Sequence, residues 1–203
     1  MRLYELATTP SARRLNIFLA EKGVDIERIQ VDVRAGANLT EEFKAISANG
    51  RIPLLELDDG SYLCESVAIC RYLDELHPDD LALFGDSSLS RARVEMWHRI
   101  VELEGLVPAF QAFRNLSGVY RDRETCVPAW GEESRVRVQA FLPRLERRLA
   151  EADYLAGERY SIADIAAYVL VGFLPRLGIE VTSMAHVQRW LTRINGRPAL
   201  AGC

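Results

Sequence analysis

The stretch Asn49–Ser66, NGRIPLLELDDGSYLCES, decides how the first part of the chain folds. Pro53 opens an apolar run that continues to Leu57, which is typical of a strand that begins on a proline. Asp59-Gly60 is a dipeptide favoured in two-residue type I′ turns, because both central positions of that turn need φ > 0. The stretch therefore predicts a β-hairpin whose second strand ends near Leu63.

Both ends of this hairpin carry groups suited to a ligand. If the Ile52-Pro53 bond is cis, Ile52 turns its N–H and C=O outward, where they can pair with the backbone of a bound peptide. A helix is predicted from Glu65-Ser66 to His77-Pro78, and its N-terminus is a natural seat for a carboxylate. These features predict an extended ligand with an anionic end. An ordinary edge-strand proline and a serine helix cap explain the same residues without a ligand.

Composition narrows the class of protein. The 203 residues are 49% hydrophobic and 27% charged, as in soluble globular proteins. The net charge of −4 and the absence of a basic run argue against nucleic acid as a partner. No apolar stretch approaches the ~20 residues of a membrane helix, and the N-terminus lacks the apolar core of a signal peptide, so we expect a cytoplasmic protein. Arg13-Arg14 is expected on a solvated helix face.

The four cysteines have neither the spacing of a zinc site nor a Cys-x-x-Cys redox motif. We expect reduced thiols and no metal site. The four are Cys64, Cys70, Cys126 and Cys203.

The segments around the hairpin predict alternating strands and helices. Arg2–Leu6 alternates as a first strand, and Thr8–Ser11 sets up a helix whose C-terminal cap is Gly23. A second strand is predicted over Ile29–Val33, where apolar residues alternate. A short helix follows over Thr40–Ile46, capped by its threonine.

The order β-α-β-α-β-β-α over residues 1–77 is that of a thioredoxin-like α/β domain. In that fold the loop after the first strand faces the proline at the start of the third strand. Residues 78–88 are rich in Asp, Pro, Gly and Ser and are predicted to be a linker. Residues 89–203 are predicted to form an all-α helical bundle domain, with long helices near 90–113 and 131–152.

Four motifs in this order resemble the cytosolic glutathione transferases along nearly the whole chain. They are Thr8–Arg14, Arg51–Leu54, Glu65-Ser66, and Tyr154–Gly157 running into Ser161–Asp164. The last of these is also a variant of a helix capping box, which is a folding signal. The resemblance implies a thioredoxin-like domain joined to an all-helical domain.

The resemblance also implies where glutathione binds. A cis Pro53 would follow Ile52, whose backbone would pair with the cysteinyl unit, and Glu65 and Ser66 would hold the γ-glutamyl amine and carboxylate. Asn38 and Arg51 lie where the family often places polar groups near the rest of the tripeptide, including its glycine carboxylate. A solvated loop asparagine and a surface arginine are the alternatives for these last two.

The proposed chemistry is to hold the glutathione thiol as thiolate. Lowering a thiol pKa by about two units needs ~2.7 kcal/mol. One charge-assisted hydrogen bond supplies roughly 1.5 to 3 kcal/mol and a helix N-terminus about 0.3 to 1, so neither a metal nor a general base is required. We expect the donor to be Thr9, then Ser11, then Thr8. In the alternative, Thr9 only caps its helix and backbone N–H groups hold the thiolate.

The sequence thus predicts a glutathione transferase that directs the thiolate at a small soft electrophile. Glutathione is a co-substrate and no cofactor is expected. The resemblance implies a homodimer. The alternatives are a glutathione-dependent isomerase, dehalogenase or peroxidase, and a non-catalytic interaction module that resembles the stringent starvation proteins.

Overall fold

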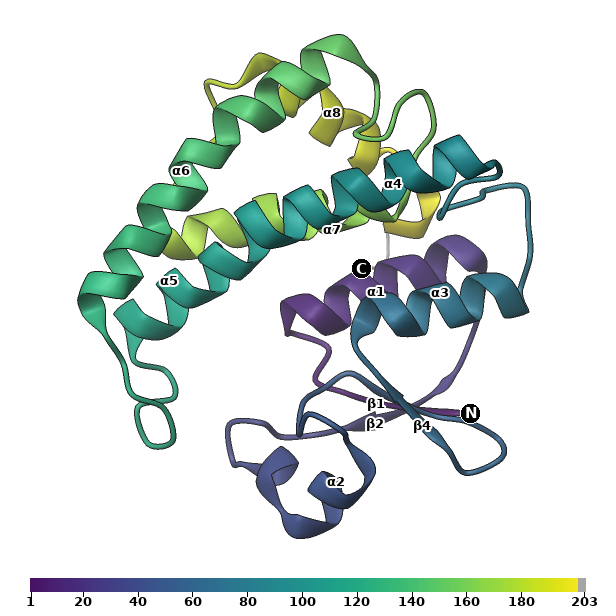
Figure 1. The fold of residues 1–203 in the computed structure, drawn as a ribbon, viewed down its shortest axis with the longest axis vertical. Coiled ribbons are helices and arrows are strands. Elements are labelled where there is room, and N and C mark those ends of the chain that lie inside the picture. The colour runs from purple at the N-terminus through teal and green to yellow at the C-terminus, as the bar shows by residue number, and fades with distance from the viewer. Residues whose placement is uncertain (201–203) are drawn as a thin grey trace. The chain divides into compact units, whose positions relative to one another are not determined.

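The computed structural model describes residues 1–200 and divides the chain into two compact units (Figure 1). The N-terminal unit comprises residues 1–82 and 198–200, and the helical unit comprises residues 83–197. The division falls within the predicted linker at 78–88. Residues 198–200 were expected in the helical domain, but they group with the N-terminal unit. Cys203 lies outside the described residues.

The N-terminal unit has the predicted order of elements around a four-stranded sheet, β2-β1-β3-β4. β1 pairs parallel with β2 and antiparallel with β3, and β3 pairs antiparallel with β4. The thioredoxin-like prediction is confirmed. The elements are β1 (Arg2–Glu5), α1 (Pro10–Lys22), β2 (Glu27–Gln30), η1 (Ala37–Leu39), α2 (Glu41–Ile46), β3 (Leu54–Glu56), β4 (Tyr62–Cys64), α3 (Ser66–Leu76) and η4 (Pro198–Leu200).

Helices cover both faces of this sheet (Figure 1). α1 and α3 pack against each other on the face that carries the fully buried Leu3 and Leu55. On the other face, Phe43 of α2 packs in a small core with Leu54, and Tyr4 lies against that core. The alternation of side chains along each strand therefore supplies two separate apolar layers.

Local capping signals set the helix ends of this unit. The Thr9 side chain caps α1, and Gly23 ends that helix in the left-handed conformation at φ 62°. Thr40 caps α2 through the N–H of Phe43. The predicted Gly23 and Thr40 caps are confirmed, because each depends on a few neighbouring residues only, and the Thr9 cap was the alternative given for that residue.

The predicted position of the second strand is wrong. β2 covers Glu27–Gln30, before most of the alternating segment 29–33. Val31 and Val33 are nevertheless buried, because they pack with Phe43 after the strand has ended. The alternation of apolar residues therefore reflects packing against α2 as well as strand pairing.

The hairpin turn also differs from the prediction. Gly60 has φ 81°, but Asp59 does not have positive φ, which excludes a type I′ turn. The Gly60 N–H donates to the Leu57 carbonyl at 3.1 Å, and the Leu57 N–H donates to the Ser61 carbonyl at 2.8 Å. The loop is a three-residue connection with glycine at its left-handed position.

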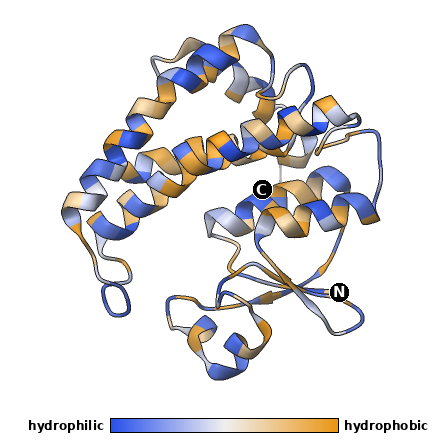
Figure 2. Cartoon of the chain, in the orientation of Figure 1, coloured by the Kyte–Doolittle hydropathy of each residue, from blue (hydrophilic) through white to orange (hydrophobic). Residues whose placement is uncertain are grey.

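The helical unit is built around α7, which is buried along almost its whole length. Figure 2 shows α7 as mostly hydrophobic on the side in view, as expected for a central helix. The elements are α4 (Ser88–Ile100), η2 (Val101–Leu106), α5 (Val107–Ser117), α6 (Pro128–Glu151), α7 (Ile162–Phe173), η3 (Leu174–Leu177) and α8 (Ala185–Asn195). The prediction of an all-helical second domain is confirmed.

α4, η2 and α5 form one continuous helical path with a π-helical segment at η2. Pro108 follows this segment and lacks the N–H that a regular α-helix would use. Gly105 within η2 lies so close to Leu170 and Phe141 that an added Cβ would clash with Leu170. Glycine therefore permits η2 to approach α7 closely.

Asp164 is a buried junction in the helical unit. Its carboxylate accepts the Ser161 N–H at 3.0 Å, the Leu155 N–H at 2.9 Å and the Trp190 indole N–H at 3.1 Å. Burial raises the pKa of Asp164 to about 6, although these hydrogen bonds oppose the shift. The predicted capping box is confirmed, and it also ties α7 to α8.

Candidate functional site

Ser66 stands at the N-terminus of α3 and is 5% exposed. Its hydroxyl oxygen accepts a hydrogen bond from Nη1 of Arg14 at 3.3 Å. The Ser66 hydroxyl donates to no group among residues 1–200, and no side chain caps the helix. The first backbone N–H groups of α3, together with this hydroxyl, can therefore donate to an anion.

Arg14 is a residue of this site that the sequence prediction missed. It was expected on a solvated face, but it is only 4% exposed and reaches from α1 to α3. The prediction failed because the partner lies 52 residues away. The available signal that position 14 faces inward was the run of apolar residues before and after it on α1, among them Ala12, Leu15 and Phe18.

Glu65 has an unusual backbone conformation, with φ 70° and ψ 111°. A non-glycine residue in such a region costs about 1 to 3 kcal/mol and is held there by its surroundings. Oε1 of Glu65 accepts a hydrogen bond from Nδ2 of Asn49 at 2.7 Å. Oε2 has no hydrogen-bond partner among the described residues, so it can accept one from a ligand cation.

The Ile52-Pro53 peptide bond is cis. Pro53 is buried at the start of β3, and Ile52 packs against the small core under α2. Neither the N–H nor the C=O of Ile52 has a hydrogen-bond partner in the described part of the chain. An extended ligand can therefore pair with both groups.

Strand register brings three predicted segments to one end of the sheet. Leu54 lies opposite Tyr4 on β1 and opposite Cys64 on β4. Continuing both antiparallel registers by two residues sets Ile52 level with Leu6 and with Ser66. The loop after β1, the cis-proline segment and the start of α3 thus converge.

Arg51 belongs to the loop before the cis proline, and Asn38 of η1 bonds to that loop. Nδ2 of Asn38 donates to the Gly50 carbonyl at 2.8 Å, so its amide is turned toward the loop. The Arg51 N–H donates to Oδ1 of Asn49 at 3.0 Å, while the Arg51 side chain is exposed. The contacts give Asn38 a role in shaping the loop and leave the Arg51 side chain accessible.

The three hydroxyl groups predicted to donate a hydrogen bond to the thiolate differ in their surroundings. The Thr9 hydroxyl donates to the Leu6 carbonyl at 2.9 Å and accepts the Ala12 N–H at 3.4 Å, so its proton is already engaged in the cap. Thr8 is exposed and Ser11 is half-buried. Neither of these two hydroxyls has a hydrogen-bond partner among residues 1–200.

Cys70 of α3 is close to this site in the chain but is shielded from solvent. Cys70 follows Ser66 by one turn of α3 and is fully buried. Burial raises the pKa of the Cys70 thiol, which Arg14 opposes through its charge. Cys64, Cys70 and Cys126 are free thiols. A protonated, buried thiol is a poor nucleophile.

Residues 1–200 offer neither a metal-binding cluster nor a membrane-spanning helix. No three His, Cys, Asp or Glu side chains in that range gather in a way that could hold a metal ion. No helix there is long and apolar enough to cross a membrane.

Known proteins resemble this chain in both units. Residues 8–76 match the family described as glutathione S-transferase, N-terminal domain, and residues 128–198 match glutathione S-transferase, C-terminal domain. The crystal structure of a class Gtt2 glutathione S-transferase of Vibrio parahaemolyticus is 54% identical in sequence, with a TM-score of 0.89, over 98% of this chain and 95% of that one.

Two curated relatives extend this comparison. Glutathione S-transferase 2 of Saccharomyces cerevisiae is 28% identical over 98% of this chain and 88% of its own length. Disulfide-bond oxidoreductase YfcG of Escherichia coli is 32% identical over 95% of this chain and 89% of its own length.

Proposed function

Because the chain belongs to the glutathione S-transferase family, we propose that it binds glutathione in its N-terminal unit and directs the glutathione thiolate at a small soft electrophile, so that a new C–S bond joins the whole glutathionyl group to the electrophile as a leaving group departs. The observation that carries this proposal is the hydrogen bond from the buried Arg14 to Ser66 at the N-terminus of α3. A buried guanidinium, a serine hydroxyl with no acceptor and uncapped helix N–H groups together favour a carboxylate.

The γ-glutamyl end of glutathione carries both a carboxylate and an ammonium group. In our proposal the carboxylate accepts from the Ser66 hydroxyl, which Arg14 orients by donating to its oxygen. The ammonium donates to Oε2 of Glu65, which Asn49 holds in place through Oε1. The cysteinyl backbone pairs with the N–H and C=O of Ile52, beside the cis Pro53.

For the thiolate we propose Ser11 as the main donor. The sequence favoured Thr9 as the donor, and that role of Thr9 stays a prediction. Its hydroxyl proton, however, already bonds to the Leu6 carbonyl. Ser11 is in the first turn of α1, where both its N–H and its hydroxyl lack partners among residues 1–200. Thr8 is the second alternative. Two hydrogen bonds at a helix N-terminus are enough to lower the thiol pKa by about two units.

The partner in a homodimer is proposed to bind along α4 and η2. Leu89, Met96 and Leu103 recur every seven residues and are between 48% and 60% exposed. A seven-residue spacing brings side chains to one side of a helix. A second copy of the chain, related by a two-fold axis, would cover this apolar row.

The test combines calorimetry with glutathione and an assay of conjugation to a chlorodinitrobenzene. We expect binding at millimolar glutathione or below, together with conjugation that Ser66→Ala weakens through a higher KM for glutathione. Absence of binding at millimolar concentration would contradict the proposal and favour an interaction module. Binding with glutathione-dependent isomerisation, dehalogenation, or peroxide or disulfide reduction, but without conjugation, would contradict the transfer step alone.

A further inference from the structure

Ser47 is a buried polar residue to which the proposed function assigns no role. It is the C-cap of α2 and is 4% exposed. Its backbone N–H donates to the Phe43 carbonyl at 3.0 Å, and its carbonyl accepts the Gly50 N–H at 3.2 Å. Because Phe43 packs in the small core with Leu54, these bonds fix Ser47 to the framework of the N-terminal unit.

The Ser47 hydroxyl lies beside the backbone of Arg51. It donates to the Arg51 carbonyl at 3.2 Å and accepts from the Arg51 N–H at 3.3 Å. The hydroxyl has one proton, and the other acceptor within reach is Oδ1 of Asn49 at 3.4 Å. That oxygen already accepts the Arg51 N–H at 3.0 Å, so the closer carbonyl is the better partner for the proton. No other donor among residues 1–200 bonds to the Arg51 carbonyl, whose orientation therefore depends on Ser47.

The Arg51 carbonyl and the Ile52 N–H belong to one peptide group. The group is planar and trans, so these two bonds point in opposite directions. A hydroxyl that holds the carbonyl toward Ser47 therefore turns the Ile52 N–H away from Ser47. This N–H has no partner in the described part of the chain. The buried Ser47 side chain thus sets the direction of a donor that it does not touch.

We propose that Ser47 is a positioning residue for glutathione, which aims the Ile52 N–H at the carbonyl of the cysteinyl unit. This inference rests on the proposed function, because it assumes that the cysteinyl backbone binds beside Ile52. It goes further by assigning the direction of that hydrogen bond to a buried hydroxyl. Without the hydroxyl, the peptide group is free to rotate and its N–H is no longer held toward the ligand.

Two thiol probes isolate this hydrogen bond. γ-Glutamylcysteinamide has the cysteinyl carbonyl and γ-glutamylcysteamine lacks it, whereas the γ-glutamyl group and the thiol are the same in both. Calorimetric titration of the full chain gives both Kd values. We expect the wild-type protein to bind the carboxamide about fivefold more tightly, the usual net value of one neutral hydrogen bond. Ser47→Ala should bring the two Kd values within about twofold of each other.

The ratio of the two Kd values excludes an indirect effect through Glu65. Ser47 also reaches Asn49, which donates to Oε1 of Glu65 at 2.7 Å. Glu65 is proposed to bind the γ-glutamyl ammonium, a group that both probes have. A change in that contact would shift both Kd values together and leave their ratio unchanged.

Two variants of the same segment distinguish aiming of the N–H from general loosening of α2. Thr40→Ala removes the N-terminal cap of α2, a bond of 3.2 Å from the Phe43 N–H, and leaves the Ser47 hydroxyl in place. Ser47→Thr keeps a hydroxyl on an extended backbone, φ −109° and ψ 113°, which β-branched residues adopt readily. Both variants should keep the preference for the carboxamide. Thermal melting checks that each variant folds.

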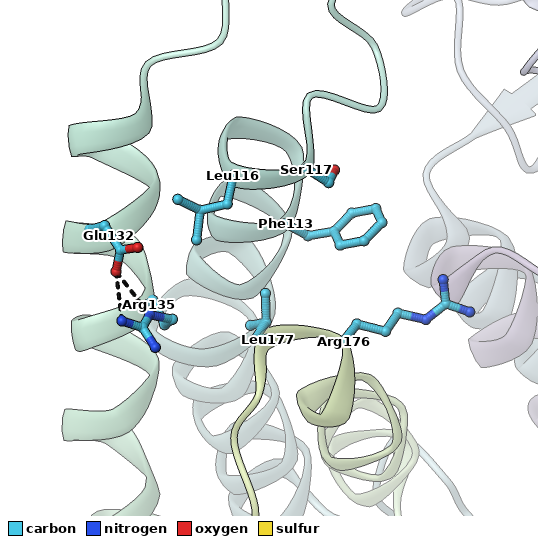
Figure 3. A pocket seen from close by; sticks show the side chains of 7 residues that line it. All are labelled: Phe113, Leu116, Ser117, Glu132, Arg135, Arg176 and Leu177. Atoms are coloured by element: carbon cyan, nitrogen blue, oxygen red, sulfur yellow. Dashed lines mark hydrogen bonds and ion pairs between the residues drawn. The ribbon is translucent and has the colours of Figure 1, made fainter.

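A third variant tests where the probes bind. The helical unit has a cavity of its own, lined by Phe113, Leu177 and Arg176 among others (Figure 3). Arg176→Gln changes the charge of that cavity and leaves every contact of Ser47 in place, so both Kd values should stay within about twofold of wild type. Loss of probe affinity in Arg176→Gln would locate the measured binding in the helical unit and overturn the inference.

Titration with glutathione separates this inference from the proposed function. If the folded wild-type protein binds no glutathione, the proposed function fails and the role of Ser47 fails with it. If glutathione binds but the wild type does not prefer the carboxamide, or Ser47→Ala keeps the preference, only the role of Ser47 is overturned. That role is also overturned if Thr40→Ala loses the preference as Ser47→Ala does, because loosening of α2 then explains both results.

Discussion

Replacing Arg14 with methionine tests the proposed carboxylate seat most directly. Arg14 donates to Ser66 at 3.3 Å and is 4% exposed, so its charge acts on the N-terminus of α3 with little screening by water. A hydrogen bond that involves a charged group contributes about 1.5 to 3 kcal/mol. The loss should therefore raise the Kd for glutathione by roughly 10- to 150-fold.

Methionine is the suitable replacement because it is unbranched and fills a space similar to that of the arginine stem. Replacing a whole buried ion pair with apolar side chains often leaves stability unchanged, whereas removing one buried charge alone can destabilise the fold, so the stability of the variant has to be measured as well. The assay is calorimetric titration with glutathione, beside thermal melting of the same variant. Arg13→Met, at the neighbouring and less buried position, is the matched control and should bind glutathione within about twofold of wild type.

A second ligand separates the carboxylate from the rest of glutathione. Glutathione with its γ-glutamyl carboxylate converted to an amide lacks the charge that Arg14 is proposed to stabilise. Wild-type protein should bind this analogue much more weakly than glutathione, whereas Arg14→Met should discriminate little between the two. If Arg14→Met binds glutathione with wild-type affinity while folding normally, the reasoning from the Arg14–Ser66 contact is wrong.

Three further predictions address the thiolate, pH and assembly. Ser11→Ala should raise the apparent pKa of the bound glutathione thiol by about one to two units, which corresponds to the loss of one charge-assisted hydrogen bond. Thr9→Ala should mainly lower the free energy of unfolding by about 1 kcal/mol, because it removes a helix cap. The pH dependence of turnover and urea unfolding measure the two effects, and the reverse pattern would restore Thr9 as the donor. The pKa of Asp164 is about 6 in the folded state, above its unfolded value, so the stability that its protonation contributes is full below about pH 4 and lost as the pH rises to about 6. Between about pH 4 and 6 the free energy of unfolding of the wild type, measured relative to that of Asp164→Asn, should therefore fall by up to about 3 kcal/mol. A difference that stays constant with pH would exclude the shift. Leu103→Glu should shift the protein to monomers in analytical ultracentrifugation, because an unpaired buried charge costs about 3 to 5 kcal/mol, and an unchanged dimer would place the interface elsewhere.

The parts of the fold that could be predicted are those set by neighbouring residues. The threonine and glycine caps of α1 and the box at Ser161–Asp164 are local signals, and the structure confirms them. The start of α8 has no such signal. The backbone N–H groups of His186 and Val187 donate to the carboxylate of Glu146 on α6, 40 and 41 residues earlier in the chain.

The candidate site likewise contains residues that could be predicted from the sequence and residues that could not. Ile52, Glu65 and Ser66 sit in one continuous stretch, so strand register and a helix start suggested that they lie together. Arg14 was missed because an arginine on an amphipathic helix is usually solvated and its partner Ser66 lies 52 residues away, so the apolar neighbours of Arg14 on α1 were the only local signal of its burial. The engaged hydroxyl of Thr9 was hidden for another reason: a capping residue and a catalytic hydroxyl have the same sequence signature.

The return of residues 198–200 to the N-terminal unit makes the helical unit an insertion within it. η4 contacts α1, and Leu200 is buried there. Covalent connections therefore join the two units twice, near residue 82 and near residue 197. A protease that cuts only the first connection would leave the halves linked through the second. A fragment ending at residue 82 would also expose the α1 surface that Leu200 covers, so excising the N-terminal unit by its first boundary alone would give an incomplete fold.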